Sequence, residues 1–235
     1  MDFGKALSFV FQDKDWLRKI GMASLITFIG MLCLILPGAI FLSGYMVTLA
    51  RNVKDGVEHP LPGTDDWGSI FSEGARVFGI MIVYNLPLIL LSCVLGGSGA
   101  FLQSMSEDGG GVGSVLVLIN NCLSLPLGLL TGLMMMAALV RYIQFGEMSA
   151  AMNFGATWQL LRSNIADFFL VILMSIVVQV IALLVVSVSA VTICGPFVLI
   201  IPAFVWRQSV MGYLLGQIAG RDAMSNKEKM YGDEF

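Results

Sequence analysis

Long apolar stretches with almost no charged residue alternate along the chain with shorter polar segments. Four such stretches stand out, at residues 20–50, 77–103, 112–140 and 166–219. A helix of about 20 apolar residues crosses the hydrocarbon layer of a membrane, so each stretch is long enough for at least one crossing. The last stretch is too long for one crossing and is interrupted at Gly195-Pro196, which predicts one helix over 166–192 and a second over 197–219.

The stretch at 20–50 contains a possible turn at Leu36-Pro37-Gly38. A single crossing would place Arg51 across the membrane from the basic N-terminus, against the excess of Lys and Arg on cytoplasmic loops. A hairpin of two helices, 20–36 and 38–50, avoids this conflict, and so does a re-entrant pair that stops short of the far face. The loops that carry bases then all face the cytoplasm: 1–19, 51–76, 141–165 and 220–235. We predict six membrane segments as three helical hairpins, with both termini in the cytoplasm.

A short amphipathic segment precedes each predicted hairpin. In each segment the apolar residues recur three or four positions apart, which places them on one face of a helix. The three sets are Phe3, Ala6, Leu7 and Val10; Trp67, Ile70, Phe71, Gly74, Ala75 and Phe78; and Met148, Ala151, Met152, Gly155 and Trp158. Such helices lie in the headgroup plane of a membrane, where Trp is frequent. We expect Trp16, Trp67 and Trp158 to be anchors at the cytoplasmic interface.

The first and third of these segments share a four-residue pattern, Met1-Asp2-Phe3-Gly4 and Met152-Asn153-Phe154-Gly155. This pattern and the common plan can reflect an internal repeat, or they can reflect the way any amphipathic segment beside a membrane looks.

The predicted fold class is an all-α integral membrane protein in which a cytoplasmic interface helix precedes each hairpin. A single transmembrane domain covers residues 1–235. Its units are 1–51, 66–140 and 148–220, and a polar tail follows at 221–235.

Composition supports the membrane class and argues against others. Of the 235 residues, 57% are apolar and 12% are charged, whereas soluble domains carry about 25% charged residues. The net charge is −3 and no Lys/Arg-rich stripe is present, so nucleic-acid binding is not expected. The four cysteines lie far apart in apolar stretches and the one histidine precedes Pro60 in a loop. We therefore expect no disulfide framework, metal site or cofactor.

Several motifs along the chain occur in a recognisable order. They are Met-Asp-Phe-Gly-Lys-Ala-Leu at the start, Asp13-Lys14-Asp15-Trp16-Leu17, Gly44-Tyr45 before Arg51-Asn52, Pro60-Leu61-Pro62 before Asp65-Asp66-Trp67-Gly68, and Gly212-Tyr213-Leu214-Leu215-Gly216-Gln217. This order resembles an uncharacterised family of prokaryotic polytopic membrane proteins, domain of unknown function 4013, over nearly the whole chain. The resemblance implies a multi-pass protein of the cytoplasmic (inner) membrane of a prokaryote, and it brings no established activity.

Two glycine motifs lie in predicted membrane helices. Gly128 and Gly132 form GxxxG, and Gly212, Gly216 and Gly220 form GxxxGxxxG in the last helix. Small residues allow close approach of helix backbones in a membrane. We interpret the first pair as a packing contact within the chain. The second run can pack within the chain or form a seam with a partner or a second copy.

Polar side chains inside the predicted helices are the candidate intramembrane contacts. They are Asn85, Asn120, Asn121, Gln179, Arg207, Gln208 and Gln217. Three of the helices also contain a proline (Pro87, Pro126 or Pro202), which leaves a carbonyl free that an amide can bond. Holding helices together is the simpler role for these amides, and a transport path of kinked helices is the alternative. Apart from Asp167 at a helix start, the apolar segments contain no acidic residue for a proton or cation relay, which argues against that path.

Arg207 is the candidate with the sharpest consequences. It lies between Pro196 and Gln217, about 16 Å into the membrane at about 1.5 Å per residue. A charge at that depth costs about 2.5–3.5 kcal/mol on insertion scales. Its partners would be the amides named above, a carbonyl freed near Pro202, a lipid phosphate or an acid on another subunit. Alternatively the helix tilts or begins late, near Pro202, and Arg207 snorkels to the outer interface beside Trp206.

No catalytic pattern is present in the sequence. The adjacent acids Asp65-Asp66 are better explained as a cap for the helix that starts near Trp67. The glycine-rich segment 107–111 is acidic and lacks the lysine of a phosphate-binding loop. We predict a non-enzymatic protein of the lipid bilayer that scaffolds, or assembles with, other membrane proteins or itself. A small-solute or lipid transporter or channel component is the alternative.

Overall fold

The computed structural model of the chain describes residues 2–34, 36–63, 66–105, 111–189 and 195–232. Within these ranges the chain is helical apart from its connecting loops and contains no strand, which confirms the all-α prediction. The elements are α1 (Phe3–Gln12), α2 (Trp16–Leu34), α3 (Leu36–Lys54), α4 (Trp67–Leu91), the π-helical turn η1 (Ser92–Gly97), α5 (Ser98–Met105), α6 (Val112–Phe145), α7 (Met148–Met152), α8 (Phe154–Ser163), α9 (Ile165–Ser189) and α10 (Gly195–Gly232).

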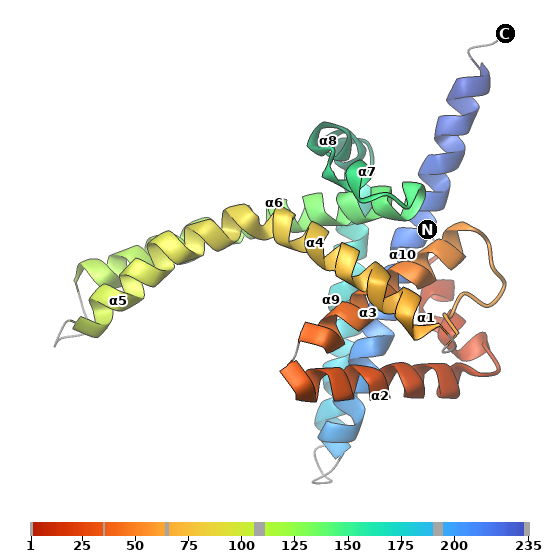
Figure 1. Cartoon of the computed structure of the whole chain (residues 1–235), viewed down its shortest axis with the longest axis horizontal. Coiled ribbons are helices and arrows are strands. Elements are labelled where there is room, and N and C mark those ends of the chain that lie inside the picture. Colours follow the sequence, from red (N-terminus) through yellow and green to blue (C-terminus); the bar gives the residue numbers. More distant parts are fainter. Residues whose placement is uncertain (1, 35, 64–65, 106–110, 190–194, 233–235) are drawn as a thin grey trace.

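Helix α3 is the centre of the body of the molecule, with α2, α4 and α10 packed around it (Figure 1). Almost every residue from Phe41 to Ala50 is buried. The apolar stretch 20–50 forms two helices that lie against each other, and they separate next to Pro37, which fits the first turn of a helix. A Cβ atom placed on Gly30 would lie 2.6 Å from the Gly38 nitrogen, so the two backbones are in direct contact.

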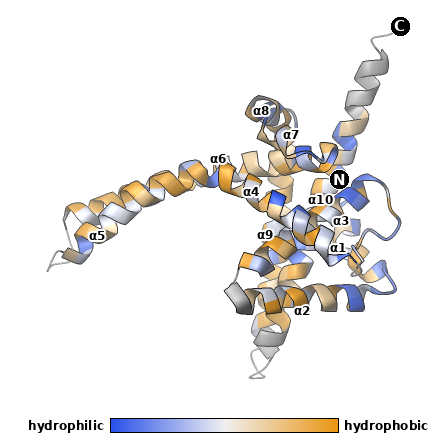
Figure 2. Cartoon of the chain, viewed as in Figure 1, coloured by the Kyte–Doolittle hydropathy of each residue, from blue (hydrophilic) through white to orange (hydrophobic). Residues whose placement is uncertain are grey.

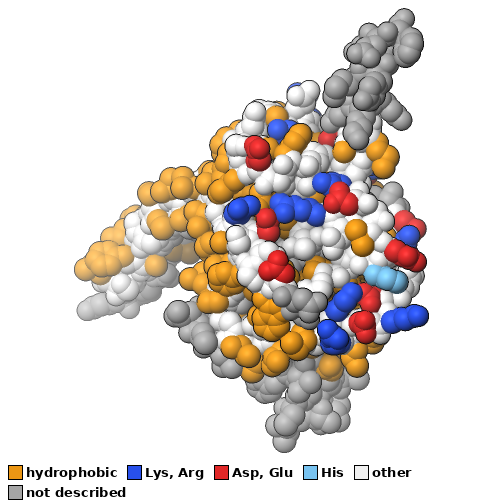
Figure 3. Space-filling model, turned by 45° about the vertical axis from the view of Figure 1, so that its right-hand side comes forward, with side chains coloured by type: hydrophobic (Ala, Val, Ile, Leu, Met, Phe, Trp, Pro, Cys, Tyr) orange, Lys and Arg blue, Asp and Glu red, His pale blue; other side chains and the backbone are white. Residues whose placement is uncertain are grey.

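Two apolar arms leave this body in different directions (Figure 1). One consists of α4, η1 and α5 lying along α6, and the other pairs α9 with the first half of α10. Both arms are apolar over most of their length (Figure 2). The charged side chains gather on the body and are sparse on the first arm (Figure 3). Apolar surface of this extent is typical of a protein that lies in a membrane.

Four helical segments among the described residues are long and apolar enough to cross a membrane. They are Trp67–Met105, Val112–Phe145, Ile165–Ser187 and Leu199–Met224. They support the membrane class that the apolar stretches predicted. The six-segment arrangement, in which α2 and α3 would supply the other two, stays a prediction.

The predicted interface helices differ from one another in the structure. The apolar face of α1 packs on the protein: Phe9 and Val10 are buried, and the Phe9 ring stacks on Tyr213 with 4.5 Å between centroids. The second segment is not a separate helix, because α4 runs unbroken from Trp67 to Leu91 and continues through η1. The third is divided at Asn153 into α7 and α8.

Local capping explains several of these boundaries. The carboxylate of Asp2 accepts a hydrogen bond from the Lys5 N–H (3.0 Å), and the amide oxygen of Asn153 accepts one from the Ala156 N–H (3.1 Å). The shared Met-Asp/Asn-Phe-Gly pattern is therefore, in both places, a helix N-cap followed by the first helical residues. Asp66 caps α4 in the same way through the Ser69 N–H (3.2 Å), as predicted, and Asp65 lies outside the described residues.

The last helix is longer than expected. α10 continues through the predicted polar tail as far as Gly232, so residues 221–232 extend the helix. The predicted break at Gly195-Pro196 lies at its first two residues, where proline is favourable.

Asp13, at the joint between α1 and α2, predicts a dependence of stability on pH. Burial opposes ionisation, but hydrogen bonds from Lys19 (2.7 Å) and the Asp15 N–H (2.9 Å) outweigh it and hold the pKa of this carboxyl below 3.8. A lowered pKa stabilises the fold above the unfolded-state value, and that contribution disappears as the pH falls through the folded-state value. The melting temperatures of the wild type and Asp13→Asn should therefore differ at neutral pH and converge below pH 3.8. A difference that does not change with pH would contradict this assignment.

Candidate functional site

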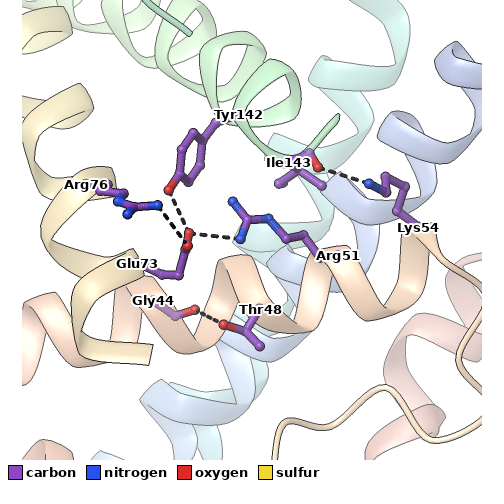
Figure 4. A network of polar contacts seen from close by, with 8 residues as sticks. All are labelled: Gly44, Thr48, Arg51, Lys54, Glu73, Arg76, Tyr142 and Ile143. Carbon is purple, nitrogen blue, oxygen red and sulfur yellow. Dashed lines mark hydrogen bonds and ion pairs between the residues drawn. The ribbon is translucent and has the colours of Figure 1, made fainter. Parts of the chain in front are cut away.

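A cluster of polar side chains around Glu73 joins three helices at the junction between the body and the first arm (Figure 4). Arg51 on α3 lies 3.0 Å from one carboxylate oxygen of Glu73, and Arg76 lies 3.3 Å from the other. The Tyr142 hydroxyl on α6 donates a hydrogen bond of 2.6 Å to the same carboxylate. The Arg51 guanidinium also lies over the Tyr142 ring, 5.0 Å from its centroid. We call Arg51, Glu73, Arg76 and Tyr142 the polar junction.

Further polar contacts tie the neighbouring helix ends to this junction. Lys54 donates to the carbonyl of Ile143 at 3.3 Å (Figure 4), and Gln144 donates to a carboxylate oxygen of Asp222 at 2.9 Å. An ion pair joins Arg221 in the second half of α10 to Asp167 near the start of α9. The ends of α3 and α6, the starts of α4 and α9 and this part of α10 are thereby held in one polar layer. Charge-assisted hydrogen bonds of this kind fix the relative positions of helices better than apolar contacts alone.

Glycines allow the helices to approach closely enough for the junction to form. A Cβ atom on Gly44 would lie 1.8 Å from the Ile70 carbonyl oxygen, and one on Gly74 would lie 1.9 Å from the Ile40 carbonyl oxygen. Helices α3 and α4 therefore cross with their backbones in contact. This crossing places Glu73 beside Arg51.

The two glycine motifs have opposite surroundings. A Cβ atom on Gly212 would lie 2.7 Å from the Met46 carbonyl oxygen, and one on Gly216 would lie 2.5 Å from that of Ala50, while Gly220 lies farther out beside Lys54. The C-terminal run thus packs within the chain, on α3. A Cβ on Gly128 would meet the Leu88 side chain at 3.9 Å, and one on Gly132 would have no described atom within 4 Å. Gly128 therefore has an ordinary packing contact within the chain, and Gly132 has none with the described atoms.

Arg207 lies on a helix that begins early. Because α10 starts at Gly195 and passes through Pro202, a late start at that proline is wrong. Arg207 is half-buried, and its Nε is buried without a hydrogen-bond partner. Among the described residues, no hydrogen bond or ion pair joins it to the amides that were predicted as its partners. Its neighbour Trp206 also has an unpartnered buried Nε1.

The predicted amides do not form one cluster. Asn85 donates to the Met81 carbonyl on its own helix (2.8 Å) and approaches the Met135 sulfur (3.7 Å). Asn120 lies beside Gly96 of η1 with its carbonyl oxygen buried and unbonded among the described residues, and Asn121 is exposed. Gln217 accepts a hydrogen bond from the Asp2 N–H (3.2 Å). Two half-buried amides complete the set: Gln179 on α9 and Gln208 on α10.

The three predicted tryptophan anchors lie at the surface of the body or close to it. Trp16 is half-buried and meets Phe11 edge to face at 5.1 Å. Trp67 and Trp158 are exposed at 37% and 46%. Their depth in a membrane stays a prediction.

Cavities lie between the elements of the body. One, of about 330 Å³, is bounded by α1, α10 and the loop after α3, with Lys5, Glu58 and His59 among its polar walls. A second, about 240 Å³, is an apolar groove between α2, α3 and the start of α4, with Trp67 and Phe71 at its edge. A third, about 220 Å³, lies beside Asn52 and Asp66. In the part of the chain that the structure describes, no group of three His, Cys, Asp or Glu side chains could hold a metal ion.

The polar junction was not among the residues singled out from the sequence. Glu73 and Arg76 lie three positions apart at the start of a long apolar helix, which is a usable signal. The sequence argument placed them only within the base-bearing segment 51–76. The partners Arg51 and Tyr142 could not be assigned from sequence separation.

Comparison with known proteins shows that the chain matches one protein family. The family described as protein of unknown function (DUF4013) matches residues 19–191, from α2 to the end of α9. No curated protein and no solved structure matches the chain. The match covers more than half of the chain and confirms the family that the motifs indicated, while the motifs before residue 19 and at 212–217 lie outside the matched residues. The chain therefore belongs to the DUF4013 family of proteins of unknown function.

Proposed function

We propose that this protein is a non-enzymatic integral membrane protein that acts as a scaffold or subunit of a membrane assembly. The observation that carries the proposal is one open face of α6. Asn121, Leu125, Gly128 and Gly132 lie within a narrow sector of that helix at 3.6 residues per turn. Leu125 is 78% exposed, Asn121 is exposed, and the two glycines have little or nothing packed against them.

The side chains on this face of α6 are better suited to contact with a neighbouring helix than with lipid. An amide that faces hydrocarbon loses its hydrogen bonds, and a neighbouring helix can restore them. The GxxxG pair leaves a shallow surface on which a second backbone can approach closely. A helix of another subunit would therefore meet an amide and a smooth surface on the same side of α6.

The oligomeric state of the protein in its own membranes tests this proposal. Gly132→Leu and Asn121→Leu should each reduce the assembled fraction, measured by crosslinking followed by native electrophoresis. Gly97→Leu on η1 is the matched control, because a Cβ there also has no described atom within 4 Å. A wild-type chain that runs as a monomer would overturn the proposal, and so would equal assembly of all three variants.

The transporter alternative has weaker support. The intramembrane amides lie on two separate arms, with Asn85 and Asn120 on one and Gln179 on the other. A solute path through one chain would need them to converge, as polar groups do at the midplane of secondary transporters. Purified protein reconstituted alone in liposomes should accordingly move no solute.

We further propose that the chain lies in the cytoplasmic membrane of a prokaryote with both termini inside. The polar layer supports this topology, because it gathers the base-bearing ends of the helices in one place. Lys19 also donates to the Leu61 carbonyl (3.3 Å), so the start of α2 lies beside the loop after α3. The membrane segments would be three hairpins, with α2 and α3 crossing twice or re-entering. Amphipathic residues near Trp16, Trp67 and Trp158 would lie at the cytoplasmic interface.

Cysteine labelling checks this topology. In a cysteine-free background, Lys14→Cys and Val57→Cys should react with an impermeant reagent from the cytoplasmic side, and Met105→Cys from the outer side. All three positions are exposed. If Lys14→Cys and Val57→Cys react from opposite sides, the stretch 20–50 crosses the membrane once and the topology is wrong.

A further inference from the structure

Arg207 lies in the middle of a membrane-spanning helix. It is twelve residues from Gly195 at the start of α10, and fourteen residues from Arg221, which belongs to the polar layer. At about 1.5 Å per residue these separations are about 18 Å and about 21 Å. Both distances exceed the reach of an arginine side chain.

The side chain of Arg207 belongs to the outward face of α10. Ile200 and Phe204 share this face at helical spacing and are 49% and 37% exposed. Val205 and Ser209 lie on the opposite face and are fully buried. Arg207 is half-buried beside this face, and its Nε is buried without a hydrogen-bond partner.

No acid of the described chain is available to pair with this charge. Glu73 is bound by Arg51, Arg76 and Tyr142, and Asp167 is paired with Arg221. No Asp or Glu occurs in the sequence between Asp167 and Asp222. A guanidinium in hydrocarbon is costly unless it meets an anion or water, so an external partner is required.

We propose that Arg207 forms an ion pair with an Asp or Glu carboxylate on a membrane helix of a different protein. The guanidinium is planar and permanently charged, and it matches a carboxylate through two parallel hydrogen bonds. The sequence has no Asp or Glu in the stretches 77–103, 112–140 and 168–219, so the apolar helices of a second copy offer no carboxylate there. A lipid phosphate would have to leave the headgroup layer to reach it. The exposed apolar side chains of Ile200 and Phe204 would pack against the same helix.

This inference rests on the proposed function and names the chemistry of the partner. A photocrosslinking phenylalanine analogue at position 204, on the face of Arg207, tests it in native membranes. We expect one crosslinked membrane protein, joined through a transmembrane peptide that contains Asp or Glu. Its yield should fall roughly tenfold in Arg207→Leu. Gln208→Leu, one position away on the same helix, should leave the yield unchanged.

A charge exchange separates pairing from simple proximity. Changing the partner's carboxylate to an amide should lower the yield as much as Arg207→Leu does. Arg207→Glu combined with an arginine at the partner's position should restore it. Melting curves of each variant check that the fold is retained.

The alternatives give distinct results. Crosslinks to lipid alone, to a second copy of the chain, to no molecule, or to a partner whose yield does not depend on Arg207 all overturn the inference. If the chain still migrates as an assembly in those cases, the proposed function survives without it. A monomeric chain would overturn both.

Discussion

Glu73→Gln should lower the free energy of unfolding of the protein by about 2–3 kcal/mol, because it removes the negative charge that two arginines share. Arg51 and Arg76 would then face each other in the polar junction without a counter-ion, and Tyr142 would lose its carboxylate acceptor. Removing one partner of a fully buried pair costs about 3–5 kcal/mol, and the partial exposure of Arg76 reduces this figure. Unfolding in detergent, followed by circular dichroism, measures the change.

The control for Glu73→Gln is Glu58→Gln, because Glu58 is exposed in the loop after α3. It should change stability by less than about 0.5 kcal/mol. Arg51→Met in the Glu73→Gln background should recover part of the loss, since it removes one of the two uncompensated positive charges. Equal stability of Glu73→Gln and the wild type would mean that the junction does not hold the helices together.

Gly44→Ala should destabilise the protein by about 1–3 kcal/mol or more, through overpacking at the crossing of α3 and α4. The added methyl group would lie 1.8 Å from the Ile70 carbonyl oxygen, which is backbone and cannot rotate away. The two helices must then separate, and Arg51 moves away from Glu73. A lower melting temperature in detergent measures the effect.

Gly132→Ala is the matched control, since it is the same substitution in a helix with no described atom near the new methyl group. It should be neutral or stabilising by up to about 1 kcal/mol, because alanine favours a helix over glycine. Were both variants to melt at the wild-type temperature, the close crossing at Gly44 would be wrong.

These variants separate stability from assembly. Glu73 and Gly44 hold the helices of one chain together. In the second group, Gly132 and Asn121 have open sides, and Arg207 is half-buried with its Nε unbonded among the described residues. Loss of stability is expected from the first group and loss of assembly from the second. If a variant of the second group had a lower melting temperature than the wild type, its residue would instead stabilise the fold of the single chain.

The helices and several of their boundaries could be predicted from the sequence, because they depend on residues close together in the chain. The length of each apolar stretch sets whether a helix can cross a membrane, and four of the described helices meet that length. Pro37 and Pro196 mark helix starts because proline fits the first turn and disrupts later ones. Asp66 marks another, because its carboxylate bonds a backbone N–H three residues away.

Only the tertiary structure decided which surfaces are covered. The two glycine motifs are equivalent in sequence, yet Gly216 touches α3 and Gly132 has an open side. A GxxxG motif predicts a helix face without large side chains. The path of the other helices determines whether anything packs on that face. The polar junction depends in the same way on the crossing of α3 and α4, since Glu73 and Tyr142 are 69 positions apart. Their pairing is a property of the packed helices, which no local pattern encodes.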